Sequence, residues 1–85
     1  MTFPRPSRQF YAEDVLGGRI DLDNYPFRYA FVMIGDVSTV RAGHAGLLHR
    51  MDVVFSAVEF MEARGWECLN VVDNGQVAYM RKVAR

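Results

Sequence analysis

The residues best able to bind a metal ion or transfer a proton lie around the start of a predicted helix. His49 and Asp52 are three positions apart, a spacing that places two side chains on one helix face, whereas His44 would have to fold back from the preceding loop. A closed zinc site needs four ligands, and these residues supply at most three. We therefore expect no metal and no cofactor, and interpret the group as the polar side of a helix.

Cys68, the single cysteine, is a candidate nucleophile. Its predicted neighbour across the last hairpin is Arg81, whose positive charge would lower the pKa of the thiol. A catalytic thiolate also needs a base, and no histidine is predicted within reach. A half-buried strand cysteine is the simpler interpretation, and in the absence of a paired acid and base we expect the protein not to be an enzyme.

Segment 35–46 is the most natural place for a functional loop, since it is rich in glycine and small polar residues. Asp36, Ser38 and Thr39 suggest contact with a phosphate, but no glycine-rich fingerprint followed by lysine is present. The alternative is a plain connection between a strand and a helix.

Length and charge narrow the classes of protein. The chain has 85 residues, enough for one domain, with ten acidic and ten basic side chains and no formal net charge. Proteins that bind nucleic acid normally carry a positive excess, so the charge argues against that partner. No apolar run approaches the roughly 20 residues that cross a bilayer. One cysteine and a start unlike a signal peptide indicate a cytoplasmic protein with no membrane partner.

The front of the chain predicts an arm followed by an ambiguous element. Residues 1–8 hold two prolines and no apolar period, which is typical of a flexible arm in front of a single α+β domain over 9–85. Between residues 9 and 22, the Gly17-Gly18 pair favours a hairpin with a primed turn. A short helix capped by Ser7 and ending at the glycines is the alternative.

Residues 27–34 carry the strongest strand signal. Phe27, Tyr29, Phe31 and Met33 alternate with Ala30, Val32 and Ile34, so both faces are apolar. This pattern predicts a strand that is central in its sheet or covered by a partner on its second face.

Residues 47–64 show a helical period, and Gly65 is placed to end the helix in a left-handed conformation. The main apolar stripe consists of Leu47, Met51, Val54, Val58 and Met61, with Leu48 and Phe55 along its edge. A second stripe consists of Val53, Ala57 and Phe60. A helix that is apolar on two sides has two neighbours, and we expect the chain to be too short to supply both.

Asn74-Gly75 predicts a primed turn between two closing strands. The resulting register pairs Val72 with Val77, Val71 with Ala78, Asn70 with Tyr79, Leu69 with Met80, Cys68 with Arg81, Glu67 with Lys82 and Trp66 with Val83. One side, with Leu69, Val71, Ala78 and Met80, is apolar and is assigned to the core. The other side mixes Trp66, Tyr79 and Arg81 with smaller and polar residues, a composition typical of protein interfaces. Cover by the N-terminal segment is the alternative.

A helix that ends in Ala63-Arg64-Gly65-Trp66-Glu67, then a strand, a turn and a strand closing with Arg81-Lys82, resembles small uncharacterised bacterial domains built as strand, helix and hairpin. The resemblance spans roughly residues 27–83. It implies a fold but no reaction. The first 26 residues and the loop at 35–46 depart from the short versions of such domains.

The sequence thus predicts an α+β fold, with an antiparallel sheet of three to five strands and one long helix packed on one face. We expect a non-catalytic module that binds a protein partner or forms a homo-oligomer. The predicted interaction residues are Val53, Ala57, Phe60, Trp66, Tyr79 and Arg81. The alternative is binding of a small ligand or single-stranded nucleic acid through sheet aromatics, Trp66, Tyr79 and Tyr29, together with Arg28, Arg81 and Lys82.

Overall fold

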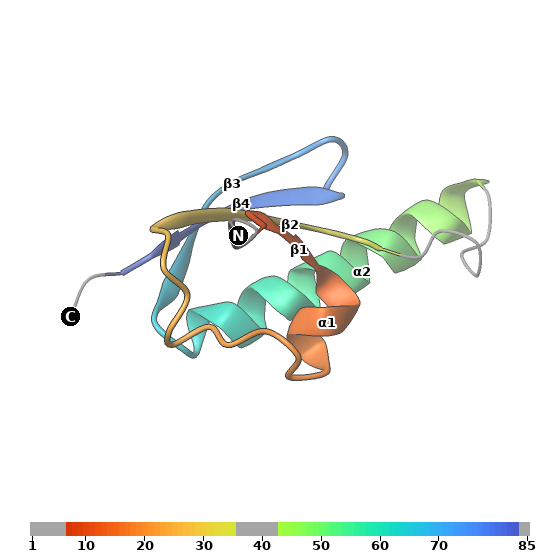
Figure 1. The fold of residues 1–85 in the computed structure, drawn as a ribbon. Helices are drawn as coiled ribbons and strands as arrows, with labels where there is room; N and C mark the ends of the chain where they lie inside the picture. Colours follow the sequence, from red (N-terminus) through yellow and green to blue (C-terminus); the bar gives the residue numbers. More distant parts are fainter. Residues whose placement is uncertain (1–6, 36–42, 84–85) are drawn as a thin grey trace, which may run out of the picture.

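The computed structural model describes residues 7–35 and 43–83, with side chains from residue 46 onward in the second part. It is an α+β fold in which a four-stranded sheet carries the long helix α2, Gly43–Glu62, and the short helix α1, Ala12–Leu16. Both helices lie on the same side of the sheet (Figure 1). The predicted fold class is confirmed in its one long helix packed against a sheet.

The sheet is mixed, so the prediction of a purely antiparallel sheet is wrong. Its strands are β1, Gln9–Tyr11; β2, Tyr29–Met33; β3, Trp66–Val72; and β4, Val77–Lys82. They are arranged in the order β1-β2-β4-β3, with β1 parallel to β2 and the other two pairs antiparallel. After β1 the chain crosses beneath the sheet through α1 and the following loop, and this crossover allows β2 to run in the same direction as β1 (Figure 1).

The predicted hairpin over residues 9–22 is also wrong, because its glycines end a helix. The Gly18 N–H donates to the Val15 carbonyl at 3.2 Å, and the Arg19 N–H donates to the Asp14 carbonyl at 2.9 Å. Gly18 has φ +72°, and the three features together form a Schellman motif. The alternative of a short helix that stops at the glycines was correct. Its proposed cap was not, since the N-cap is Tyr11 and the Ser7 hydroxyl accepts from the Gln9 N–H instead.

The long helix begins four residues before the predicted Leu47 and ends two before Arg64. Helix propensity does not predict this start, because the first turn contains glycines and glycine is a poor helix former. Gly65 follows with φ +88°, as predicted for the residue that ends the helix. Residues 36–42, which include Asp36, Ser38 and Thr39, and residues 1–6 of the predicted arm lie outside the described part of the chain.

The core fills the space between the sheet and the two helices. Helix α2 contributes Val54, Ala57, Val58 and Met61, all buried. The sheet contributes Phe10, Ala30, Val32, Trp66, Ala78 and Met80, and the N-terminal crossover adds Ala12, Val15, Leu22 and Tyr25. The crossover is therefore the second neighbour of α2, and the expectation that the chain is too short to supply one is wrong.

The closing hairpin has the predicted turn but only part of the predicted register. Asn74 and Gly75 have φ +57° and +82°, and the Gln76 N–H donates to the Asp73 carbonyl, as a primed turn requires. Asp73 just before them also has a positive φ, +56°. From the turn outward, Val72, Val71 and Asn70 pair as expected with Val77, Ala78 and Tyr79.

A β-bulge between Cys68 and Asn70 then shifts the register by one residue. Beyond it, Cys68 faces Met80, Glu67 faces Arg81, and Trp66 faces Lys82. Neighbouring residues of a strand point to opposite faces of the sheet. The single extra residue therefore places Trp66, Glu67 and Cys68 on the opposite face from the one predicted.

Candidate interaction surface

The sheet has a second face that no helix among the described residues covers. On β2, Tyr29, Phe31 and Met33 alternate with the buried Ala30 and Val32 and therefore point to this side. The strand register places Tyr79 directly opposite Phe31, and Tyr11 directly opposite Met33. We call this side the open face; its aromatic residues are Tyr11, Tyr29, Phe31 and Tyr79.

The aromatic residues of the open face are accessible. Tyr11, Tyr29 and Tyr79 are between 43% and 48% exposed, although each lies within a strand rather than in a loop. A large aromatic side chain half out of water on a regular sheet surface retains much apolar area that a partner can bury. The open face is therefore an accessible aromatic surface on a regular sheet.

The charges at one end of this face neutralise each other. Arg81 forms an ion pair with Glu67 on the adjacent strand β3. The shifted register places these two residues directly opposite each other. Tyr29 lies opposite Arg81 on the other side. The pair leaves the open face aromatic and close to neutral, a composition that resembles protein–protein interfaces.

The six predicted interaction residues do not form one surface. Tyr79 and Arg81 lie on the open face, as predicted. Trp66 is only 3% exposed and packs in the core, with its ring centroid 6.0 Å from that of Phe10 and 5.8 Å from that of Tyr25. The bulge explains this placement, since it turns Trp66 to the helix side of the sheet.

The second stripe of α2 is also turned inward. Ala57 is fully buried, and Val53 and Phe60 are half-buried and pack against the core. Phe60 lines a hollow together with residues 18–23 of the N-terminal crossover, and the Arg64 guanidinium covers its ring at 3.6 Å from the centroid. These three residues therefore stabilise the monomer in the structure.

Sequence reasoning missed Tyr11 and Phe31 as members of the candidate surface. The alternation in segment 27–34 did indicate a role for Phe31, because it predicted a strand with two apolar faces, the second of which a partner would cover. Tyr11 carried no such signal, since its position on the open face depends on β1 pairing parallel to β2.

Cys68 does not have the environment that a reactive thiol needs. Its partner across the ladder is Met80 rather than Arg81, so the expected neighbouring cation is paired with Glu67 instead. Burial raises the pKa of the Cys68 thiol, and the negative charge of Glu62 raises it further. A raised pKa means less thiolate at neutral pH and therefore a weaker nucleophile.

His49 and Asp52 are both exposed on α2. Within residues 7–35 and 43–83, no three His, Cys, Asp or Glu side chains lie close enough together to hold a metal ion. His44 falls in the first turn of α2, whose side chains are outside the described part. The described residues therefore add no third ligand to His49 and Asp52.

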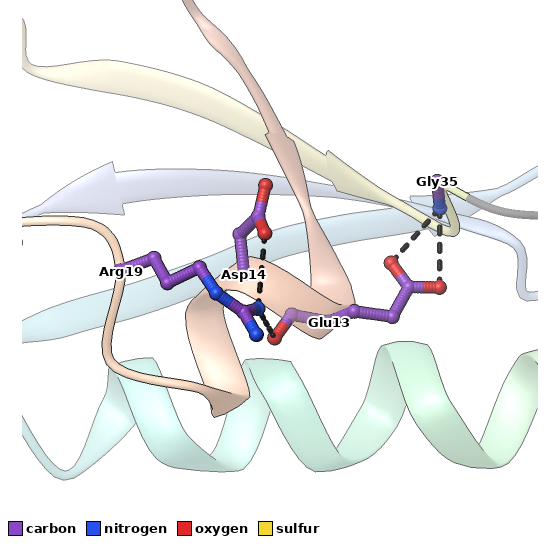
Figure 2. A network of polar contacts seen from close by, with 4 residues as sticks. All are labelled: Glu13, Asp14, Arg19 and Gly35. Carbon is purple, nitrogen blue, oxygen red and sulfur yellow. Dashed lines mark hydrogen bonds and ion pairs between the residues drawn. The ribbon is translucent and has the colours of Figure 1, made fainter.

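A hydrogen bond joins the chain just after β2 to helix α1. Both carboxylate oxygens of Glu13 accept the Gly35 N–H, at 3.0 and 3.2 Å, while Arg19 binds the neighbouring Asp14 at 3.2 Å (Figure 2). Gly35 lies so close to the Tyr11 ring that a Cβ atom there would come within 2.8 Å of it. These contacts hold Tyr11 in position at the edge of the open face.

Comparison of the chain with protein-family models, curated proteins and solved structures finds no match. The resemblance of residues 63–67 and the following hairpin to small bacterial domains therefore stays a prediction. Within the described ranges, none of the helices is both long and apolar enough to span a bilayer.

Proposed function

We propose that the protein is a non-catalytic interaction module that binds a protein partner through the open face, and that this partner is a second copy of the chain. The observation that carries the proposal is the row of half-exposed aromatic residues on a sheet whose other face is fully used by the core. A sheet face of this composition lowers its free energy by packing against another apolar surface.

A second copy suits the open face electrostatically. The ion pair between Arg81 and Glu67 is internal to each chain, and the chain has no formal net charge, so two copies meet without strong like-charge repulsion. A two-fold axis lets one patch meet itself, and it closes the assembly at a dimer. The single thiol suits a reducing compartment, so we place this association in the cytoplasm.

The test is the solution mass of the purified protein, measured by multi-angle light scattering over a concentration series. We expect a concentration-dependent dimer, and we expect Tyr79→Asp to shift it to a folded monomer. A monomer at all concentrations would exclude self-association. A capture experiment with the wild-type chain and the Tyr79→Asp variant, compared side by side, would then test for a different protein partner.

The alternative, binding of single-stranded nucleic acid or a small ligand at the same face, rests on the same tyrosines. The structure separates the cations on which that alternative relied. Arg81 is paired with Glu67 on the open face, whereas Arg28 and Lys82 border a hollow at the end of the sheet. Beside the tyrosines, Arg8 already donates to the Tyr29 carbonyl at 3.0 Å and its guanidinium lies over the Phe27 ring, and we rank this function second.

A further inference from the structure

Three cationic side chains from distant parts of the sequence meet at one end of the molecule. Arg28 precedes β2, Arg64 follows α2, and Lys82 ends β4, and these three ends lie together (Figure 1). Between them lies an open hollow of about 610 Å³. Its volume is within the range of about 300–1,000 Å³ that is usual for small-molecule sites.

The cations of this hollow lack carboxylate partners. The ion pairs found among residues 7–35 and 43–83 are Arg19 with Asp14 and Arg81 with Glu67, and neither involves the hollow. Asp23 also borders it, but its carboxylate lies more than 4 Å from all three cations, and the Asp21 carboxylate, which does not line the hollow, interacts with the Lys82 charge only beyond that distance. Counted over the lining residues alone, the hollow has an excess of two positive charges. Clustering like charges costs free energy, and a bound anion would recover it.

Much of the hydrogen-bonding capacity of the cations remains unused. The Lys82 ammonium donates to the carbonyls of Asp23 and Tyr25, at 2.6 and 3.2 Å, which fixes its position at the rim. Arg64 donates through Nη1 to the Phe60 carbonyl at 3.1 Å, and that bond uses one of its five N–H groups. The side chain of Arg28 is exposed and forms no hydrogen bond or ion pair with another described residue.

Part of the wall of the hollow is apolar. Phe27, Pro26 and Val83 line it beside the cations, and Gly65 leaves one side without a side chain. A ligand that fills this space would place a charged group against the two guanidinium groups and an apolar group against the wall. Guanidinium groups bind phosphate oxygens through paired, charge-assisted hydrogen bonds.

We propose that this hollow binds a small organic phosphate, a phosphate monoester whose dianion contacts Arg28, Arg64 and Lys82 while its apolar part lies against Phe27 and Val83. A monoester carries close to two negative charges at neutral pH, which matches the excess of two positive charges. The site lies outside the open face, so its occupancy does not depend on self-association.

Phenyl phosphate is a suitable probe, and the measurement is its titration into the ¹⁵N-labelled full chain at constant ionic strength, followed by amide chemical shifts. We expect saturable shifts at residues 23–28, 64–65 and 82–83, and weaker binding of inorganic phosphate and of benzoate. Arg28→Gln should weaken phenyl phosphate about tenfold, as expected for loss of a charge-assisted hydrogen bond. Arg64→Gln should act in the same direction.

Arg19→Gln is the matched control, because it removes an exposed guanidinium that is paired with Asp14 away from the hollow. It should leave the affinity for phenyl phosphate unchanged. The proposal is overturned if no saturable shifts occur, if Arg19→Gln weakens binding as much as Arg28→Gln does, or if benzoate binds as tightly as phenyl phosphate. Binding of a short single-stranded oligonucleotide without binding of phenyl phosphate would equally overturn it.

Discussion

Phe31 lies directly opposite Tyr79 across the ladder between β2 and β4, with both side chains on the open face. Cross-strand aromatic neighbours form a continuous apolar surface, because facing Cβ atoms are only about 5 Å apart. Tyr29 and Tyr11 extend that surface along β2 and onto β1. This pair is therefore the centre of the proposed interface.

A charge at the centre of the open face should dissociate the protein without unfolding it. Tyr79 is 44% exposed, so Tyr79→Asp should raise the dimer dissociation constant at least about tenfold, an effect typical of a central aromatic in an interface. Light scattering and the far-ultraviolet circular dichroism spectrum measure the two quantities. Phe55→Asp is the control, since Phe55 is 39% exposed but lies on α2, and it should leave the mass unchanged.

Phe60→Asp should act on stability rather than on association. Phe60 is half-buried, packs against the core and lies under Arg64, so a carboxylate there should lower the free energy of unfolding by about 2 kcal/mol or more. Urea denaturation measures this loss. If the Phe60→Asp variant keeps wild-type stability but no longer dimerises, Phe60 belongs to the interface, as the sequence predicted.

The bulge predicts opposite outcomes for two apolar residues of β3. Leu69 is 47% exposed beside the irregularity, and Leu69→Ser should change the free energy of unfolding by no more than about 0.5 kcal/mol. Trp66 is buried among Phe10 and Tyr25, and Trp66→Ala should cost about 3–5 kcal/mol. If Leu69→Ser proved the more damaging change in chemical denaturation, the hairpin would have the regular register without a bulge.

Loss of the Glu13 carboxylate should loosen the connection between α1 and the end of β2. Glu13→Ala removes both acceptors of the Gly35 N–H and should cost about 1 kcal/mol, while Glu13→Gln, which keeps an acceptor, should cost less. Thermal unfolding and the exchange rate of the Gly35 amide are the measurements. Glu59→Ala, at an exposed position of α2, serves as the control and should leave both unchanged.

Local patterns in the sequence determined the strand within 27–34, the closing hairpin within 66–83 with its turn at Asn74-Gly75, the long helix and the left-handed Gly65. Each of these depends on neighbours within a few residues, through side-chain period or backbone conformation. The same alternation identified Tyr29 and Phe31 as one face of a strand. The alternation shows only that the two faces of the strand differ in composition. Which part of the protein packs against each face depends on the tertiary structure.

Tertiary structure decided the rest. Gly17-Gly18 favoured a hairpin turn over a helix end by local pattern, whereas the packing of Val15 in the core under a parallel β1 selected the helix. The bulge at Leu69 leaves no mark in the alternation, yet it moved Trp66 into the core and brought Arg81 to Glu67. The hollow between Arg28, Arg64 and Lys82 exists only because three segment ends converge, and such convergence depends on the path of the whole chain.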